Sequence, residues 1–156
     1  MKKTILFLIA LGLLCASCEK TPVNEWNRFY GFTKDDIAGH YEANPDESLY
    51  EELPTEGVTV YNTATIDITS LQDNRVSLRI VIPHVINKVF SGVVNGDDST
   101  SDLILNGFGE NIMATVYKNS KGQIRMHGRV KGDRHQRDED PVIEIYGFDV
   151  LKADTK

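Results

Sequence analysis

Apolar and polar residues alternate with a period of two through much of this chain. The alternation is clearest from Val58 to Thr69, where apolar side chains share one face and mainly threonines share the other. It resumes from Val76 to Ile82, after the turn residues Gln72-Asp73-Asn74. This period is typical of half-buried strands, so the two segments predict a hairpin.

A second hairpin is predicted by the segments Ile112 to Tyr117 and Gln123 to Lys131, which flank Asn119-Ser120-Lys121-Gly122. Gly122 can take the positive φ that a short hairpin loop needs. In the last predicted strand the apolar phase shifts across Gly147, which indicates a bulge. The further strands are expected at 37–43, 85–94, 103–106 and 142–152, with loops at 45–57, 95–102 and 133–141.

One short helix is expected near the start of the patterned region. Thr33-Lys34-Asp35-Asp36 has the spacing of a capping box, in which the acid bonds back to an exposed backbone amide. The aromatic residues that precede it need a surface to pack on, and the end of a barrel or the edge of a sheet would provide one. They are Trp26, Phe29, Tyr30 and Phe32.

These elements predict an all-β fold. With one short helix and no long crossover segment, the strands must pair mainly as antiparallel neighbours. We therefore expect a single antiparallel β-barrel of about eight strands, in which closure removes the exposed edges. A β-sandwich is the alternative.

The amino terminus has a different pattern. Lys2 and Lys3 precede an apolar run from Ile5 to Leu14, which is typical of a signal peptide. The run is shorter than the roughly 20 residues that a membrane-spanning helix needs. The segment Leu14-Cys15-Ala16-Ser17-Cys18 resembles the lipobox of bacterial lipoproteins.

That resemblance implies that Cys18 is acylated and becomes the mature amino terminus. Cys15 fits the role poorly, because Leu13 and Leu14 would lie where small residues are required. The alternative is a secretory peptide cleaved near Ser17. We expect a signal peptide at 1–17, a lipidated tether at 18–29, a β-barrel domain at 30–152 and a tail at 153–156.

Lipid attachment would place the chain in the bacterial cell envelope. The membrane would be its partner through the lipid, and we expect the outer membrane, with the domain facing either the periplasm or the cell surface. Cys15 lies in the expected signal peptide and Cys18 would carry the lipid, so the domain can form no internal disulfide, cysteine zinc site or cysteine nucleophile. Without Lys2 and Lys3 the 17 basic residues fall to 15 against 23 acidic ones, so nucleic acid is not an expected partner.

A second resemblance covers roughly residues 30–152. The segment from Phe32 to Tyr41 is similar to the opening of lipocalin-type barrels, where a short helix leads into a strand with Gly, any residue, then Trp. Tyr41 stands at the Trp position, and the order of the later hairpins resembles the calycin-like domains of small bacterial lipoproteins. The resemblance implies a calycin-type barrel with one small internal ligand site or a filled interior.

The weak candidates for ligand binding form a row on one predicted strand. Arg125, His127, Arg129 and Lys131 alternate with Ile124, Met126, Gly128 and Val130. Such a row can bind an anion, but it can equally face solvent or pair with acidic neighbours while the apolar face lines the core. The four histidines show no metal-ligand spacing, and Asn95, Asp97, Asp98 and Asp102 lack the glycine and glutamate of an EF-hand.

No motif positions a catalytic nucleophile, so we expect neither an enzyme nor a cofactor or metal. Two functions remain. The first is a lipocalin-like module that binds a small apolar or amphipathic ligand. The second is a non-enzymatic envelope module that contacts a protein or glycan through loops and charged faces. Small inward residues and a continuous cavity would favour the first, and candidates for such positions are Ala64, Gly92, Gly107 and Gly128.

Overall fold

The computed structural model describes residues 26–46, 57–107, 110–134 and 142–154. The predicted leader, with Cys15 and Cys18, lies outside these residues, and so do parts of two predicted loops, 47–56 and 135–141. The described part holds one short helix and ten strands. They are β1 (Asn27–Arg28), α2 (Lys34–Ile37), β2 (Gly39–Ala43), β3 (Val58–Tyr61), β4 (Thr65–Ser70), β5 (Arg75–Ile82), β6 (Ile86–Val93), β7 (Asp102–Asn106), β8 (Asn111–Lys118), β9 (Ile124–Arg134) and β10 (Val142–Lys152).

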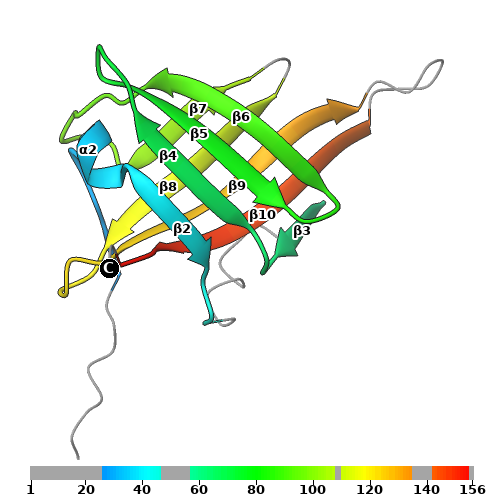
Figure 1. Cartoon of the computed structure of the whole chain (residues 1–156), viewed down its shortest axis with the longest axis horizontal. Helices are drawn as coiled ribbons and strands as arrows, with labels where there is room; N and C mark the ends of the chain where they lie inside the picture. Colours follow the sequence, from blue (N-terminus) through cyan, green and yellow to red (C-terminus); the bar gives the residue numbers. More distant parts are fainter. Residues whose placement is uncertain (1–25, 47–56, 108–109, 135–141, 155–156) are drawn as a thin grey trace, which may run out of the picture.

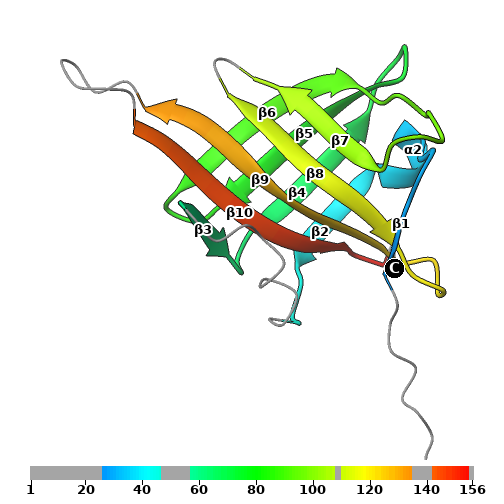
Figure 2. The ribbon, with the colours of Figure 1, turned by 180° about the vertical axis from the view of Figure 1, so that it is seen from behind.

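Eight of these strands form a closed antiparallel barrel, which confirms the predicted fold class. Each strand from β5 to β10 pairs with the strand before it, and β10 returns to pair with β2, which also pairs with β4. Figure 1 looks onto β2, β4, β5 and β6, and Figure 2 onto β7, β8, β9 and β10. The sandwich alternative is wrong, because the sheet closes on itself. The architecture is consistent with a calycin-like fold.

Two further strands lie beside the barrel. β1 pairs with the end of β8, so the folded domain reaches into the stretch expected to be a tether. β3 pairs in parallel with the middle of β10, from Val58 opposite Ile145 to Tyr61 opposite Phe148. The single strand predicted over 58–69 is therefore wrong, because a turn at 62–64 divides it into β3 and β4. β2 is shorter than β10, and β3 covers part of the β10 edge that β2 leaves free.

The predicted bulge at Gly147 is also wrong. The register between β9 and β10 is continuous from Val142 opposite Arg134 to Leu151 opposite Arg125. Tyr146 follows the inward phase of Phe148 and Val150, whereas Ile145 is on the outer face. The apolar phase shifts along the sequence because β3 pairs beside Ile145 and half-buries it.

The predicted capping box is present and begins the short helix. Thr33 Oγ1 accepts a hydrogen bond from the Asp36 amide at 3.2 Å, and the Asp36 carboxylate accepts one from the Thr33 amide at 2.8 Å. The Asp36 carboxylate also accepts from the Thr33 hydroxyl at 2.6 Å, and this bond, together with the one from the Thr33 amide, lowers the pKa of Asp36 below its usual value. Phe32 is buried and its ring centroid lies 6.2 Å from that of Phe29, so these two aromatics pack at the α2 end of the barrel.

Strand β2 and strand β10 each contribute a side chain that donates a hydrogen bond to the backbone of α2. Tyr41 is fully buried, and its hydroxyl donates to the backbone oxygen of Ile37 at 2.7 Å. Lys152 lies opposite Tyr41 in the register, and its Nζ donates to the backbone oxygen of Asp36 at 2.7 Å.

The barrel interior is filled by large side chains. The fully buried ones include Tyr41, Phe90, Phe148, Leu78 and Leu105. Neighbouring inward positions of β8 and β9 are small because the two strands approach closely there. A Cβ on Gly128 would meet the backbone oxygen of Met113 and would lie 2.7 Å from the Cα of Ala114.

Substitution of Gly128 tests this close approach. Gly128→Ala should lower the free energy of unfolding by about 3 kcal/mol or more, because the clash is with backbone rather than with a mobile side chain. Gly96→Ala is the control, since the nearest atom to its Cβ would be 3.8 Å away. It should change stability by about 0.5 kcal/mol or less. Urea unfolding followed by circular dichroism measures both, and equal stabilities would contradict the packing described.

Candidate functional site

The basic row predicted on β9 lies on the outer face of the barrel. Ile124, Met126 and Val130 are buried in the core, so the residues between them point outward. The row is nevertheless divided by burial. Arg125 is 1% exposed and His127 is 9% exposed, whereas Arg129 is half-buried and Lys131 is exposed.

Arg125 and His127 converge on one buried carboxylate, that of Asp149 on β10. The register places Asp149 directly opposite His127 and two positions from the partner of Arg125. Arg125 Nε lies 3.0 and 2.9 Å from the two oxygens of Asp149, and a guanidinium nitrogen of Arg125 also donates to Oδ2. His127 Nδ1 lies 3.0 Å from Oδ2.

Asn44 completes this arrangement from the residue after β2. Its Nδ2 donates to Asp149 Oδ1 at 3.0 Å, and its amide donates to the backbone oxygen of Asp149 at 2.9 Å. Tyr117, opposite Arg125 on β8, places its ring centroid 5.2 Å from the guanidinium carbon. We call Asn44, Arg125, His127 and Asp149 the Asp149 cluster.

The electrostatics of the cluster favour an ionised Asp149. Burial alone raises the pKa of its carboxyl group. The hydrogen bonds from His127 and Arg125, the charge of Arg125 and the hydrogen bond from Asn44 outweigh burial, so the pKa lies below its usual value. Arg125 and Asp149 therefore form a buried ion pair, which is costly to separate.

The chemistry open to this cluster is limited. Asp149 already neutralises Arg125, so that guanidinium does not present a free charge to an incoming anion. An aspartate on the Nδ1 of a histidine can orient the ring for proton transfer. A nucleophilic hydroxyl would have to lie within hydrogen-bond reach of the other ring nitrogen, and no such bond is present among the described residues. The geometry is that of a structural ion pair.

His40 and His84 lie apart from each other. His40 is exposed on β2, with Nδ1 2.6 Å from Asp67 Oδ1. His84 is in the turn after β5, where its φ is 63°. His135 lies outside the described residues, as do the acids that follow it.

The acidic connection between β6 and β7 forms local turns. Asp97 Oδ1 accepts from the Ser99 amide at 2.8 Å, and its backbone oxygen accepts from the Thr100 amide at 3.2 Å. The Ser99 bonds lower the pKa of Asp97. Asp102 instead accepts from the Thr115 hydroxyl at 2.8 Å. Within the described ranges, no three histidine, cysteine or acidic side chains are grouped so as to hold a metal ion.

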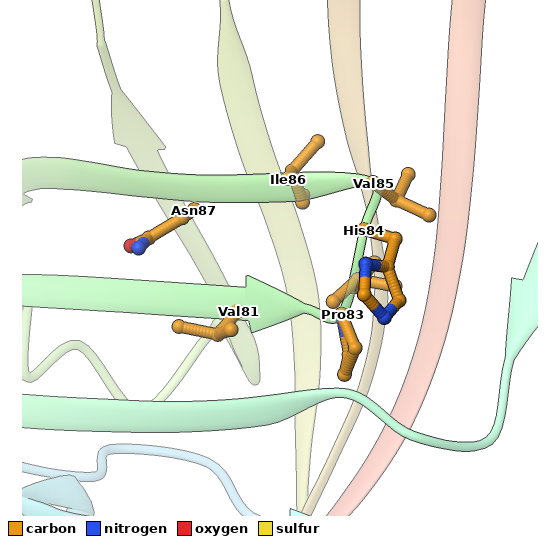
Figure 3. A pocket seen from close by; sticks show the side chains of 7 residues that line it. Val81, Pro83, His84, Val85, Ile86 and Asn87 are labelled. Carbon is orange, nitrogen blue, oxygen red and sulfur yellow. The ribbon is translucent and has the colours of Figure 1, made fainter.

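Two recesses are found near the barrel end opposite α2. One, of about 330 Å³, is lined by consecutive residues of the β5–β6 hairpin from Val81 to Asn87. Figure 3 shows His84 and Val85 at the tip of this hairpin. The other, of about 290 Å³, lies where Lys88 pairs with Glu110, beside Phe90 and Gly107. Both recesses are open to the surface.

The small inward residues do not add space to a cavity. A Cβ on Gly92 would lie 2.8 Å from a methyl carbon of Leu105, and one on Gly107 would lie 3.1 Å from the Phe90 ring. Ala64 is fully buried. Large neighbouring side chains have taken the space at the two glycines, as backbone takes it at Gly128.

Sequence reasoning found the row on β9 but missed Asp149 and Asn44. The available signal was Asp149 itself, a single acid between the apolar residues Phe148 and Val150. Its outward phase becomes clear only from the pairing with β9.

Comparison with known proteins adds no assignment: no family model, curated protein or solved structure matches the chain. Among the described residues, no helix has the length and apolar character needed to cross a membrane.

Removal of the Asp149 charge should be strongly destabilising. Asp149→Asn leaves the buried Arg125 without its counter-charge, and we expect a loss of about 3–5 kcal/mol in unfolding free energy. Arg129→Ala is the matched control on the same strand, and its effect should stay below about 1 kcal/mol. The double variant Arg125→Met, Asp149→Leu should recover most of the loss. Additive effects in the cycle of Arg125→Met, Asp149→Leu and their double variant would show that the two residues are not coupled.

The pH dependence of the same pair follows from the lowered pKa of Asp149. A depressed folded pKa stabilises the fold above the unfolded value, near 3.8, and this contribution is lost as pH falls through the folded pKa. The stability gap between the wild type and Asp149→Asn should therefore be full at neutral pH and shrink only below about pH 4. Denaturant titrations across pH 2–7 measure it.

Proposed function

We propose that this chain is a lipid-anchored protein of the bacterial cell envelope whose barrel is a non-enzymatic interaction or structural module. The observation that carries the proposal is the filled barrel interior. A module that works through its outer surface needs a rigid, packed core, whereas a carrier needs an internal space that buries most of its ligand.

The packing supports an interaction module more than a ligand carrier. Aromatic and aliphatic side chains occupy the inward positions, among them Phe90, Leu78 and Phe148. At Gly92 and Gly107 even an added Cβ would contact another side chain. The open recess at the β5–β6 hairpin is lined mainly by apolar residues, but it is formed by one hairpin rather than enclosed by the barrel.

The Asp149 cluster supports a structural role over a catalytic one. Its charges are paired with each other, and Asp149 is fully buried. Catalytic acids and bases must reach a substrate, and this carboxylate is enclosed by Arg125, His127 and Asn44.

The membrane anchor is the part of the proposal that rests on sequence alone. The leader and the lipobox-like segment before Cys18 favour acylation of that cysteine and placement in the outer membrane. The small calycin-like lipoproteins remain the group that the chain resembles. Whether the domain faces the periplasm or the cell surface follows from the leaflet that holds the lipid.

Cysteine substitutions test the anchor. Cys18→Ser should prevent acylation and leave the leader attached, so the unprocessed chain should accumulate. Cys15→Ser is the matched control and should be processed like the wild type. Intact-mass measurement of the protein extracted from bacterial membranes distinguishes the forms. A Cys18→Ser chain that matures normally would indicate ordinary secretion instead.

Binding of a small apolar probe tests the filled interior. The wild-type domain should show no benzene binding by calorimetry or chemical-shift change. Leu78→Ala, at a fully buried position that lines neither recess, should open a dry cavity, lose about 2–5 kcal/mol of stability and gain benzene binding. Ile80→Ala is a second cavity variant. Binding by the wild type, or a retained small molecule in its native mass spectrum, would favour the carrier function.

A further inference from the structure

Exposed apolar side chains gather on the outer wall formed by β6, β7, β8 and β9. Val93 is 53% exposed, Ile104 is 52% exposed and Met113 is 37% exposed. Ile104 lies directly opposite Met113. Ser91 lies opposite Asn106, so the same antiparallel register brings Val93 beside Ile104. The three side chains therefore form one row across three strands.

The row continues along β6 and is unusual for a soluble surface. Val89 has the same outward phase as Val93 and is 60% exposed. Single exposed apolar residues are common, but neighbouring ones on adjacent strands mark a contact surface. Such a surface needs an occupant that accepts aliphatic side chains.

Cations lie beside this row. Arg129 is directly opposite Met113, and Lys131 is opposite Asn111 on the same outer face. Arg75 lies opposite Val93 at the other margin. One acid on this wall, Asp102, is hydrogen-bonded to Thr115. We call Val89, Val93, Ile104, Met113, Arg129 and Lys131 the wall patch.

The charge of the wall patch contrasts with that of the whole chain. The chain has a formal charge of −6, yet the patch carries two positive residues and has Arg75 at its margin. Aliphatic side chains next to cations complement an anionic lipid surface, where headgroups attract Lys and Arg and the interface buries apolar groups.

The start of the folded domain lies on the same wall. β1 pairs with β8, with Asn27 opposite Lys118 and Arg28 opposite Tyr117, and Figure 2 shows it beside the end of β8. Asn27 is nine positions after Cys18, so even a fully extended connection spans at most about 30 Å. A lipid on Cys18 would keep this wall close to the membrane.

We propose that the wall patch lies against an anionic membrane surface, so that the anchored barrel rests on its side with β6 to β9 toward the lipid. The apolar row enters the headgroup region, and Arg129 and Lys131 contact lipid phosphates. The orientation rests on the proposed anchor at Cys18. The opposite wall, with β2 and β4, then faces away from the membrane and is free for a partner.

Single-cysteine labelling tests this orientation, because the predicted mature chain has no cysteine beyond Cys18. Ile104→Cys places a fluorophore in the wall patch. Thr69→Cys places the same fluorophore on the exposed outer face of β4 and is the matched control. The mature chain is used as isolated from bacterial membranes, and its intact mass shows whether it is acylated. It is mixed with vesicles of phosphatidylglycerol and phosphatidylethanolamine that contain a headgroup-attached quencher.

We expect quenching at position 104 to exceed that at position 69 by about threefold or more. A label in the headgroup region contacts the quencher, whereas a label on the opposite wall stays distant from it. Arg129→Glu and Lys131→Glu in the label-bearing chain should each weaken docking on the order of fivefold, because each removes one contact with anionic lipid. Lys121→Glu, in the β8–β9 loop, makes the same charge change away from the patch and should leave quenching unchanged.

The outcomes separate the two proposals. An acylated chain with equal quenching at both positions overturns the docked orientation and leaves the anchor intact. An unacylated chain that is quenched selectively at position 104 overturns the anchor and supports docking. An unacylated chain without selective quenching overturns both. If cross-linking from position 104 in intact envelopes yields one discrete protein adduct and vesicles give no selective quenching, the wall is a protein-binding surface and the lipid proposal is wrong.

Discussion

Pairing along both edges of β10 is the constraint on which the rest of the structure depends. One edge pairs with β9 over nearly its whole length, and the other pairs with β2 and β3. Without these contacts the strands from β2 to β9 would form an open sheet with two free edges. Closure instead gives the sheet one inner face, and apolar area buried there stabilises the fold by roughly 25 cal/mol per Å².

The same pairing explains which elements were predictable from sequence. The capping box at Thr33, the loop at Gly122 and the bounds of β10 depend on residues within a few positions of one another, and all were predicted. β3 was not predicted, because its position depends on Val58 meeting Ile145, far along the chain. The false bulge at Gly147 has the same origin. An apolar outer residue that lies beside a distant paired strand has the same sequence signature as a shift in phase.

The candidate site was predictable only in part, for a related reason. Strict alternation on β9 was enough to place Arg125 and His127 on the face opposite Met126. Their burial and their partner depend on the register with β10, which brings Asp149 opposite His127. Asn44 comes from yet another strand end, which the barrel closure brings beside β10. Alternation in the sequence indicates which residues share one face of a strand. Whether that face is exposed or buried depends on the tertiary pairing.

Closure also gives the inner and outer faces of the barrel different roles. The interior is occupied by side chains that hold the strands together, so the proposed function places recognition on the outer face. On the outer face of β9, the residues nearer α2 are Arg125 and His127, which are buried and contact the carboxylate of Asp149. Arg129 and Lys131, farther along the same strand, have no ionic partner among the described residues. The row that looks uniform in sequence is thus divided into a structural half and an accessible half, and only the accessible half adjoins the exposed apolar residues of β6, β7 and β8.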